Sequence, residues 1–218
     1  FSSWCGILMQ ILFGGTFDPI HYGHIALGIY ISNLFQQKVS FLPITGIPNY
    51  KQPPIATTNQ RLEMLKIITQ KYPDNFDINY SEINLANYSP TIDTLNRINT
   101  DGQTNNVVSF IIGADSLVTL DTWDEWESLF DFTNFIVAMR PHYELSNMSD
   151  KLNNFIKDRF VSINEFSNVH NGQVVTAEFN PVDIASTNLR KLISCNQNCT
   201  DYIDEDVYNY IKKHKIYY

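Results

Sequence analysis

Apolar and polar positions follow two regular patterns along this chain. Six short runs are continuously apolar or alternate every second residue, as strands do: Met9–Phe13, Val39–Ile44, Phe76–Tyr80, Val107–Ile112, Phe135–Met139 and Val174–Phe179. Apolar residues at helical spacing predict helices around Leu27–Phe35, from Thr58 through Ile68, and over Thr91–Ile98, Asp124–Phe130, Lys151–Arg159, Ser186–Ile193 and Glu205–His214. Thr58 and Ser186 are the expected N-terminal caps of their helices. Alternating strands and helices predict a doubly wound α/β fold, with a mostly parallel sheet and helices on both faces.

The first predicted strand runs directly into a segment rich in glycine and histidine. Gly14 and Gly15 end the strand and let backbone approach a ligand with no Cβ in the way. His21 and His24 are three residues apart, so they share a face of the first helical turn. Free backbone N–H groups at a helix start attract anions, and two imidazoles can donate further hydrogen bonds to phosphate. The segment therefore predicts a phosphate site at the carboxyl end of the first strand.

The residues from Gly14 to His24 read GGTFDPIHYGH. This segment resembles the signature of the nucleotidyltransferase superfamily that carries an (H/T)xGH motif. Its full form, GGTFDPIHxGH, resembles the bacterial nicotinate-mononucleotide adenylyltransferases. A lone HxGH is a weak signal, whereas eleven matching positions between a strand and a helix are a strong one. The alternative interpretation is a glycine turn with two solvated histidines.

A second segment, IASTNLR at positions 184–190, opens a later helix. Ser186 and Thr187 offer hydroxyl and backbone N–H groups, and Arg190 lies on the same side one turn further on. Taken alone, a capped helix with a surface arginine explains these residues. The segment is similar to the ISSTxxR motif that holds ATP in the same family. Ala185 replaces the first serine of that motif, at the cost of one hydrogen bond worth about 1 kcal/mol where it is made.

The segment GADSL at positions 113–117, followed by Trp123, is similar to the G-x-D-S-L…W segment of the family. By this resemblance Asp115 accepts hydrogen bonds from a ribose hydroxyl and Trp123 stacks on a pyridine ring. Core packing is the alternative for Trp123. Asp124 stands where relatives often carry an aromatic residue, and its charge would repel a nicotinate carboxylate.

Three further segments match the family more loosely. Thr91 and Thr94 resemble the T-x-x-T helix start that contacts the mononucleotide, and Arg140 resembles an arginine that meets its phosphate. In the proline-bearing loop of residues 43–57, Lys51 keeps the cation of the family's His-Lys or His-Arg pair, while Tyr50 departs from the histidine. Lys51 could reach a triphosphate, and a solvated loop lysine is the alternative.

Composition narrows the class of protein. The chain has 218 residues, with 44% hydrophobic and 17% charged residues, as expected of one folded domain with a full core. A formal net charge of −8 argues against a broad nucleic-acid-binding face, and no apolar run reaches membrane-spanning length. The first eight residues are too short for a signal peptide and are read as an upstream extension or a cloning remnant, with Met9 a possible natural start. Three cysteines, Cys5, Cys195 and Cys199, are expected to be reduced thiols in a cytoplasmic protein, with a zinc role for the last two as the alternative.

The resemblance implies an activity: transfer of AMP from ATP to nicotinate mononucleotide, giving deamido-NAD and pyrophosphate in NAD biosynthesis. The attack would be direct and in line, with no covalent enzyme intermediate, because the nucleophile is already a phosphate. Mg²⁺ is expected to bind through the ATP phosphates rather than in a protein metal site. Asp18 is interpreted as a residue that fixes the loop rather than as a ligand. The sequence does not indicate the oligomeric state.

The site residues that the resemblance implies fall into three groups. The catalytic residues are His21, His24 and Arg190. The ATP-binding residues are Gly14, Gly15, Thr16, Phe17, His21, His24, Lys51, Ile184, Ser186, Thr187 and Arg190. The mononucleotide-binding residues are Thr91, Asp115, Trp123 and Arg140.

Other functions remain open at this stage. Asp124 keeps nicotinamide mononucleotide as the nearest alternative substrate, and pantetheine phosphate or a CTP-linked substrate are further ones. A non-catalytic nucleotide sensor on the same fold is the alternative from another class, although intact His21, His24 and Arg190 argue against it. A redox dinucleotide enzyme is not favoured, because the chain has no G-x-G-x-x-G.

We predict that His24→Ala lowers turnover by orders of magnitude with little loss of fold, because the imidazole acts on the phosphates of ATP in the transition state. Steady-state kinetics together with circular dichroism check this. Near-normal turnover of a folded variant would contradict the role of His24.

Overall fold

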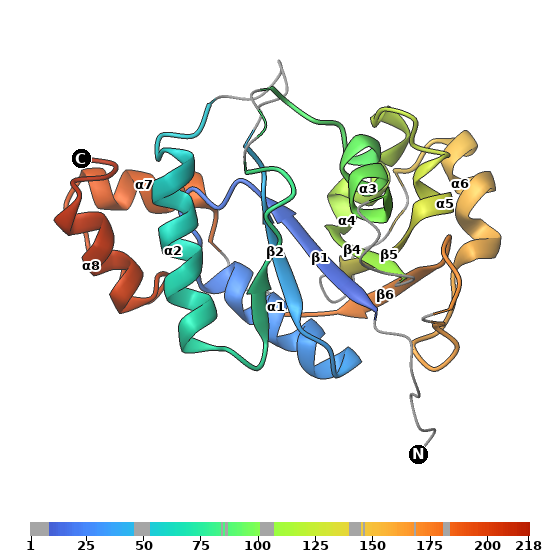
Figure 1. Ribbon diagram of the computed structural model, residues 1–218, viewed down its shortest axis with the longest axis horizontal. Helices are drawn as coiled ribbons and strands as arrows, with labels where there is room; N and C mark the ends of the chain where they lie inside the picture. The colour runs from blue at the N-terminus through green and yellow to red at the C-terminus, as the bar shows by residue number, and fades with distance from the viewer. Residues whose placement is uncertain are drawn as a thin grey trace. The chain divides into compact units, whose positions relative to one another are not determined.

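The computed structural model describes residues 9–45, 53–83, 85, 87–100, 107–139, 145, 147–167, 169–180 and 184–218. Strands and helices alternate along these segments (Figure 1). The strands are β1 (Gln10–Gly15), β2 (Val39–Pro43), β3 (Phe76–Ile78), β4 (Val108–Gly113), β5 (Thr133–Met139) and β6 (Val174–Glu178). The α-helices are α1 (Tyr22–Phe35), α2 (Thr58–Lys71), α3 (Thr91–Thr100), α4 (Ala114–Val118), α5 (Leu129–Phe132), α6 (Asp150–Ile156), α7 (Ser186–Ser194) and α8 (Glu205–Lys213). Two short 3-10 turns, Leu120–Thr122 and Lys157–Arg159, accompany them.

The strands form one six-stranded sheet in the order β3-β2-β1-β4-β5-β6. The order runs outward from β1 in both directions, as in a doubly wound sheet, and the pairs β1–β4, β4–β5, β5–β6 and β2–β3 are parallel. All five residues of β2 and the first five of β4 and β5 are buried, as expected of strands covered on both faces. The predicted α/β fold class is therefore confirmed.

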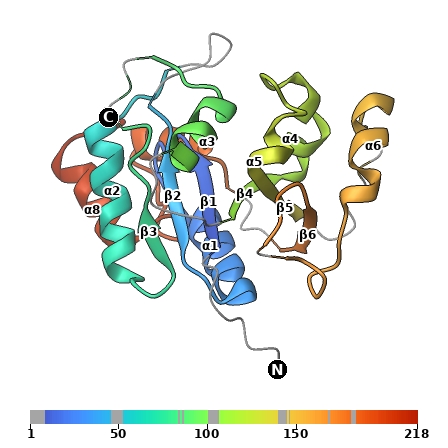
Figure 2. The same cartoon turned by 45° about the vertical axis from the view of Figure 1, so that its right-hand side comes forward.

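Contacts divide the chain into two compact units, so the single-domain organisation stays a prediction. The first unit comprises residues 1–13 and 89–180. Its sheet pairs Leu12 with Phe110 and Phe110 with Phe135, and α4 and α5 pack beside β4 and β5 (Figure 2). Aromatic side chains fill part of its core, with the ring centroids of Phe130 and Phe135 5.0 Å apart.

The second unit comprises residues 14–88 and 181–218. Strands β2 and β3 pair in the register Val39 to Phe76 and Phe41 to Ile78, and both α1 and α2 pack against them. Helices α2 and α8 lie side by side in both views (Figures 1 and 2). The C-terminal helix is thus part of the unit that contains the glycine- and histidine-rich segment.

Several predicted helix starts and faces differ from those observed. Thr57, not Thr58, caps α2, because its side chain accepts the backbone N–H of Gln60. Ala185 occupies the N-cap of α7, so Ser186 is the first helical residue. The helix predicted over Asp124–Phe130 is wrong: residues 124–128 form turns, and α5 begins only at Leu129.

The buried faces of α1 and α2 also differ in part from the predicted stripes. The apolar spacing predicts that α1 faces the core with Leu27, Tyr30, Ile31, Leu34 and Phe35. Of these, Ile31 and Phe35 are buried and Leu34 is exposed, while Ile25 and Gly28 are also buried. For α2 the spacing predicts a stripe of Leu62, Leu65 and Ile68 with Met64 on its flank. Leu65, Ile68 and Met64 are buried, Leu62 is only half-buried, and Arg61 is buried as well. Within the described residues, no helix is both long and apolar enough to cross a bilayer.

We predict that Gly28→Ala destabilises the protein by roughly 1–2 kcal/mol. A Cβ at Gly28 would lie 2.4 Å from Cε1 of Phe76, a buried ring that packs on Phe41, and this overpacking outweighs the better helix propensity of alanine. Urea unfolding measures the change. Asn33→Ala, an exposed substitution in the same helix, is the control and is expected to be near neutral. A Gly28→Ala variant as stable as the control would contradict this packing.

Candidate functional site

Phe17, in the loop between β1 and α1, combines an unusual backbone conformation with a buried side chain. Phe17 has φ 49°, in the left-handed region that a bulky residue rarely adopts, and its side chain is 2% exposed. The ring lies edge-on to His24, with centroids 5.2 Å apart, and to Phe41 at 5.3 Å. A Cβ on Gly15 would come within 2.8 Å of this ring, which explains the glycine at that position. Phe17, predicted to bind ATP, therefore has its side chain in the core beneath His24.

His21 and His24 lie together at the start of α1, as predicted. His21 is the N-cap and His24 the third helical residue, and their ring centroids are 3.8 Å apart. The backbone N–H of His21 donates to Nδ1 of His24 at 3.4 Å. A neutral His24 that accepts at Nδ1 carries its proton on Nε2, so the tautomer is set by the loop itself.

Both imidazoles are held in the neutral form. Burial lowers the pKa of His21 from its usual 6.5 to about 4. Burial, and then the neighbouring His21, hold the pKa of His24 well below its usual value. Nδ1 of His21 is buried and has no hydrogen-bond partner in the described part of the chain. At neutral pH the pair therefore offers hydrogen-bond donors without positive charge.

Two backbone N–H groups at the start of α1 already have hydrogen-bond partners within the protein. The first helical N–H, of Tyr22, donates to the carbonyl of Tyr202 at 2.8 Å, and the N–H of His24 donates to the carbonyl of His21 at 2.9 Å. These two amides are therefore committed within the protein. The prediction of free N–H groups at this helix start is wrong for both. Tyr202, in the segment before α8, supplies one acceptor, and His21 supplies the other.

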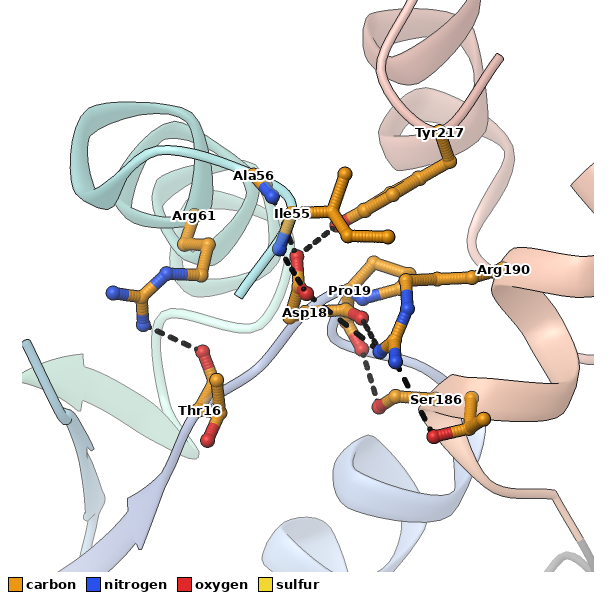
Figure 3. A network of polar contacts seen from close by, with 10 residues as sticks. Thr16, Asp18, Pro19, Ile55, Ala56, Arg61, Ser186, Arg190 and Tyr217 are labelled. Carbon is orange, nitrogen blue, oxygen red and sulfur yellow. Dashed lines mark hydrogen bonds and ion pairs between the residues drawn. The ribbon is translucent and has the colours of Figure 1, made fainter. Parts of the chain in front are cut away.

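Asp18 is buried and holds several segments of the second unit together (Figure 3). Its Oδ2 accepts the N–H of Ile55 at 2.9 Å, and its Oδ1 accepts the N–H of Ala56 at 3.0 Å. Oδ1 also accepts the hydroxyl of Tyr217 at 2.7 Å, and Oδ2 lies 3.6 Å from Nη1 of Arg190. These contacts agree with the interpretation of Asp18 as a residue that fixes the loop.

Arg61 is buried in α2 and bonds to the ends of two strands; its contact with Thr16 is drawn in Figure 3. Its Nη1 donates to the carbonyl of Thr16 at 2.7 Å and to that of Ile44 at 2.8 Å. Thr16 follows β1 and Ile44 follows β2, so one planar guanidinium sets the spacing of the two loops. Burial lowers the pKa of Arg61, and the Asp18 carboxylate opposes this shift.

The two motifs of the sequence meet in the structure. Oγ of Ser186 donates to the carbonyl of Pro19 at 3.1 Å, so this hydroxyl holds the β1–α1 loop instead of capping α7. Nη1 of Arg190 donates to the carbonyl of Asp18 at 2.7 Å, and Nη2 donates to Oγ1 of Thr187 at 3.3 Å. The start of α7 therefore lies against the residues that lead into His21, as Figure 3 shows. Gly14, Gly15 and Ile184 are half-buried at the ends of these segments.

The residues predicted to bind the mononucleotide belong to the first unit. Thr91 begins α3, whereas Thr94 is buried and accepts Nη2 of Arg97 at 2.9 Å. Asp115 is exposed in α4, and a Cβ on Gly113 would lie 2.4 Å from its Oδ1. Gly113 therefore leaves the space that this carboxylate occupies.

Trp123 and Trp126 have different surroundings. Trp123 is half-buried, and its neighbour Asp124 is exposed. Trp126 is the buried tryptophan, with its ring 4.9 Å from that of Phe155. The indole of Trp123 thus keeps some surface for a ligand, while Trp126 serves the core.

Some predicted site residues lie outside the part of the chain that the structure describes. Conversely, the sequence analysis did not identify Arg61 and Tyr217. Lys51, with Tyr50, and Arg140 lie outside the described residues. Within the described part, no group of three or more His, Cys, Asp or Glu could hold a metal ion, and Cys195 and Cys199 are free thiols. Arg61 could have been found from its place on the apolar stripe of α2. Tyr217 gave no signal beyond a tyrosine-rich tail.

Comparison with known proteins gives the class to which this fold and loop belong. Residues 12–192 match the family model described as cytidylyltransferase-like. A relative from Pseudoalteromonas atlantica, named "Probable nicotinate-nucleotide adenylyltransferase", is 34% identical over 208 residues, which are 94% of this chain and 93% of that protein. A relative of the same name from Klebsiella pneumoniae is 32% identical over 96% of this chain and 97% of its own length.

Solved structures agree on the fold. Nicotinic acid mononucleotide adenylyltransferase of Plasmodium falciparum, complexed with NaAD, matches with a TM-score of 0.73 at 21% identity, covering 96% of this chain and 97% of its own. The same enzyme complexed with APC matches with a TM-score of 0.71 at 20% identity, covering 96% and 97%.

The protein is therefore a nucleotidyltransferase with a Rossmann-like α/β fold. The chain belongs to the cytidylyltransferase-like family, and its similar relatives there are the nicotinate-nucleotide adenylyltransferases.

We predict that the protein loses stability as the pH falls from 6.5 toward 4. In that range the unfolded chain binds a proton at His21 and the folded chain does not, so acidification favours unfolding. At pH 5.5 the cost from His21 is about 1.4 kcal/mol relative to pH 8, and His24 acts in the same direction.

Urea unfolding at both pH values checks this, with His21→Asn expected to show a shallower loss than the wild type. His170→Asn, which removes an exposed imidazole, is the control and is expected to follow the wild-type profile. Equal pH dependence in His21→Asn and wild type would show that His21 is not held neutral by burial.

Proposed function

We propose that this protein transfers AMP from ATP to the 5′-phosphate of nicotinate mononucleotide, forming nicotinate adenine dinucleotide and pyrophosphate in NAD biosynthesis. The observation that carries the proposal is the contact between the two motifs: Arg190 and Ser186 of α7 donate to the carbonyls of Asp18 and Pro19, three and two residues before His21. The names of the relatives, at 32–34% identity over nearly the whole chain, support the same substrates.

The proposed reaction is one direct displacement. An oxygen of the mononucleotide phosphate forms a bond to the α-phosphorus of ATP, the bond from that phosphorus to the bridging oxygen breaks, and pyrophosphate leaves with the electron pair. The nucleophile is already ionised, so no protein base is needed. Catalysis then consists of positioning and of stabilising charge on the phosphates.

We assign the binding of ATP and the stabilisation of charge on its phosphates to residues of the second unit. His21 and His24, neutral at neutral pH, donate hydrogen bonds to the phosphates of ATP, with Nε2–H of His24 set as the donor by its contact at Nδ1. In this proposal Arg190 faces the phosphates that leave as pyrophosphate, and Ser186 and Thr187 also bind ATP. Gly14, Gly15, Thr16 and the backbone of Phe17 supply close approach, and Ile184 and Lys51 complete the ATP-binding set.

Magnesium and the second substrate complete the proposal. Asp18 uses both carboxylate oxygens within the protein, so it is not a metal ligand. Mg²⁺ would therefore bind through the oxygens of the ATP phosphates and would neutralise part of their charge. Thr91, Asp115, Trp123 and Arg140 form the mononucleotide set, with Asp115 on the ribose and Trp123 against the pyridine ring.

One observation favours the amide, nicotinamide mononucleotide, as a second candidate substrate. Asp124 is exposed beside Trp123, and a carboxylate there repels a nicotinate carboxylate and leaves a neutral amide unaffected.

The test is pyrophosphate release with ATP, Mg²⁺ and each mononucleotide in turn. We expect release to require both ATP and a mononucleotide and to be faster with the acid, with the dinucleotide identified by chromatography. Pantetheine phosphate, and CTP in place of ATP, serve as negative controls. Faster turnover of the amide would overturn the acid assignment, and no release with either mononucleotide would overturn the proposed function.

A further inference from the structure

The C-terminal tail of the chain reaches the loop that the proposed function assigns to ATP. Helix α8 ends at Lys213, and beyond it Lys215 and Tyr217 have φ of 51° and 70°, both in the left-handed region. Tyr217 is buried, at 6% exposed, and its hydroxyl donates to Oδ1 of Asp18 at 2.7 Å (Figure 3). The next residue, Tyr218, is 53% exposed. A tyrosine in this backbone conformation is strained, so its inward position depends on the contacts that it makes.

The hydroxyl binds one end of a carboxylate whose other end lies near Arg190. Oδ1 of Asp18 accepts Tyr217 and the amide of Ala56, while Oδ2 accepts the amide of Ile55. Nη1 of Arg190 lies 3.6 Å from Oδ2, yet only 2.7 Å from the backbone carbonyl of Asp18. The short contact of the guanidinium is therefore with a neutral carbonyl, and the carboxylate is held back from a close ion pair.

The charges of this cluster leave it attractive to an anion. Arg61 and Arg190 contribute two positive charges and Asp18 one negative charge, while burial and the nearby Asp18 raise the pKa of Tyr217 and keep its phenol neutral. Tyr217 thus satisfies Asp18 without adding charge. In a buried site a carboxylate that loses a donor turns toward the nearest cation, which here is Arg190.

We propose that Tyr217 is a positioning residue for the triphosphate of ATP: its hydroxyl holds the Asp18 carboxylate away from Arg190 and so leaves the guanidinium available to the β- and γ-phosphates. This proposal rests on the proposed function, since it assigns Arg190 to those phosphates. The tail residue acts through Asp18 and does not itself touch the nucleotide.

Tyr217→Phe tests the proposal, because it removes the hydroxyl and keeps the ring. Calorimetry with ATP and with AMP measures each Kd. We expect the Kd for ATP to rise about tenfold and the Kd for AMP to change less than about twofold, since AMP lacks the two phosphates that Arg190 faces. The KM for ATP is expected to rise with the Kd, while the KM for the mononucleotide stays unchanged.

Two controls separate positioning from a general loss of structure. Tyr218→Phe removes a neighbouring hydroxyl that does not contact Asp18 and is expected to bind ATP as the wild type does. In a double-mutant cycle, Tyr217→Phe is expected to have no further effect on the Kd for ATP once Arg190 is alanine, because the hydroxyl acts through that guanidinium.

Equal weakening of ATP and AMP, additive effects in the cycle, or unchanged ATP binding in Tyr217→Phe would each overturn the proposal. The proposed function fails separately, when the wild-type protein binds ATP but releases no pyrophosphate with either mononucleotide. Binding and turnover therefore report on the two hypotheses independently.

Discussion

The hydrogen bonds to the Asp18 carboxylate hold distant segments of the second unit together. Asp18 is 3% exposed, and a buried carboxylate is stable only when its oxygens are paired. Its hydrogen-bond donors come from the segment before α2 and from the C-terminal tail, and the Arg190 guanidinium of α7 lies 3.6 Å from its Oδ2. Segments separated by 37 to 199 residues are thereby fixed to one loop. Removing any one donor leaves the same charge with fewer partners, so these segments are energetically coupled.

The same contacts support the anion site that we propose for this acidic chain. The formal net charge is −8, yet Arg61 and Arg190 both bond to carbonyls of this loop, and the Asp18 carboxylate lies 3.6 Å from Arg190. Nη1 of Arg61 donates to the carbonyls of Thr16 and Ile44, and Nη1 of Arg190 donates to the carbonyl of Asp18. Positive charge is thus concentrated where strands β1 and β2 end. The neutral histidines add donors there without repelling the guanidiniums.

The sequence predicted the fold better than it predicted the details of the site. Continuous apolar runs such as Val107–Ile112 located the buried strands, because only strands covered on both faces are apolar throughout. Helix starts were less certain, since Thr57 and Thr58 are equally good caps and tertiary contacts decide between them. The sequence predicts Ser186 as a helix cap, but its hydroxyl instead donates to the carbonyl of Pro19. The contact of Tyr217 with Asp18 spans 199 residues and leaves no local pattern.

A loop fixed in this way suits a reaction that needs no proton transfer or covalent intermediate. When the nucleophile is already a phosphate, the protein lowers the barrier by holding groups in place and by presenting donors that need not reorganise. Phe17 under His24, Arg61 on two carbonyls and Asp18 on three donors each restrict the loop before a nucleotide arrives. The left-handed backbone of Phe17 shows that this restriction includes strain. Under the function that we propose, Arg61 and Asp18 would contribute to catalysis without touching a substrate, by fixing the residues that do.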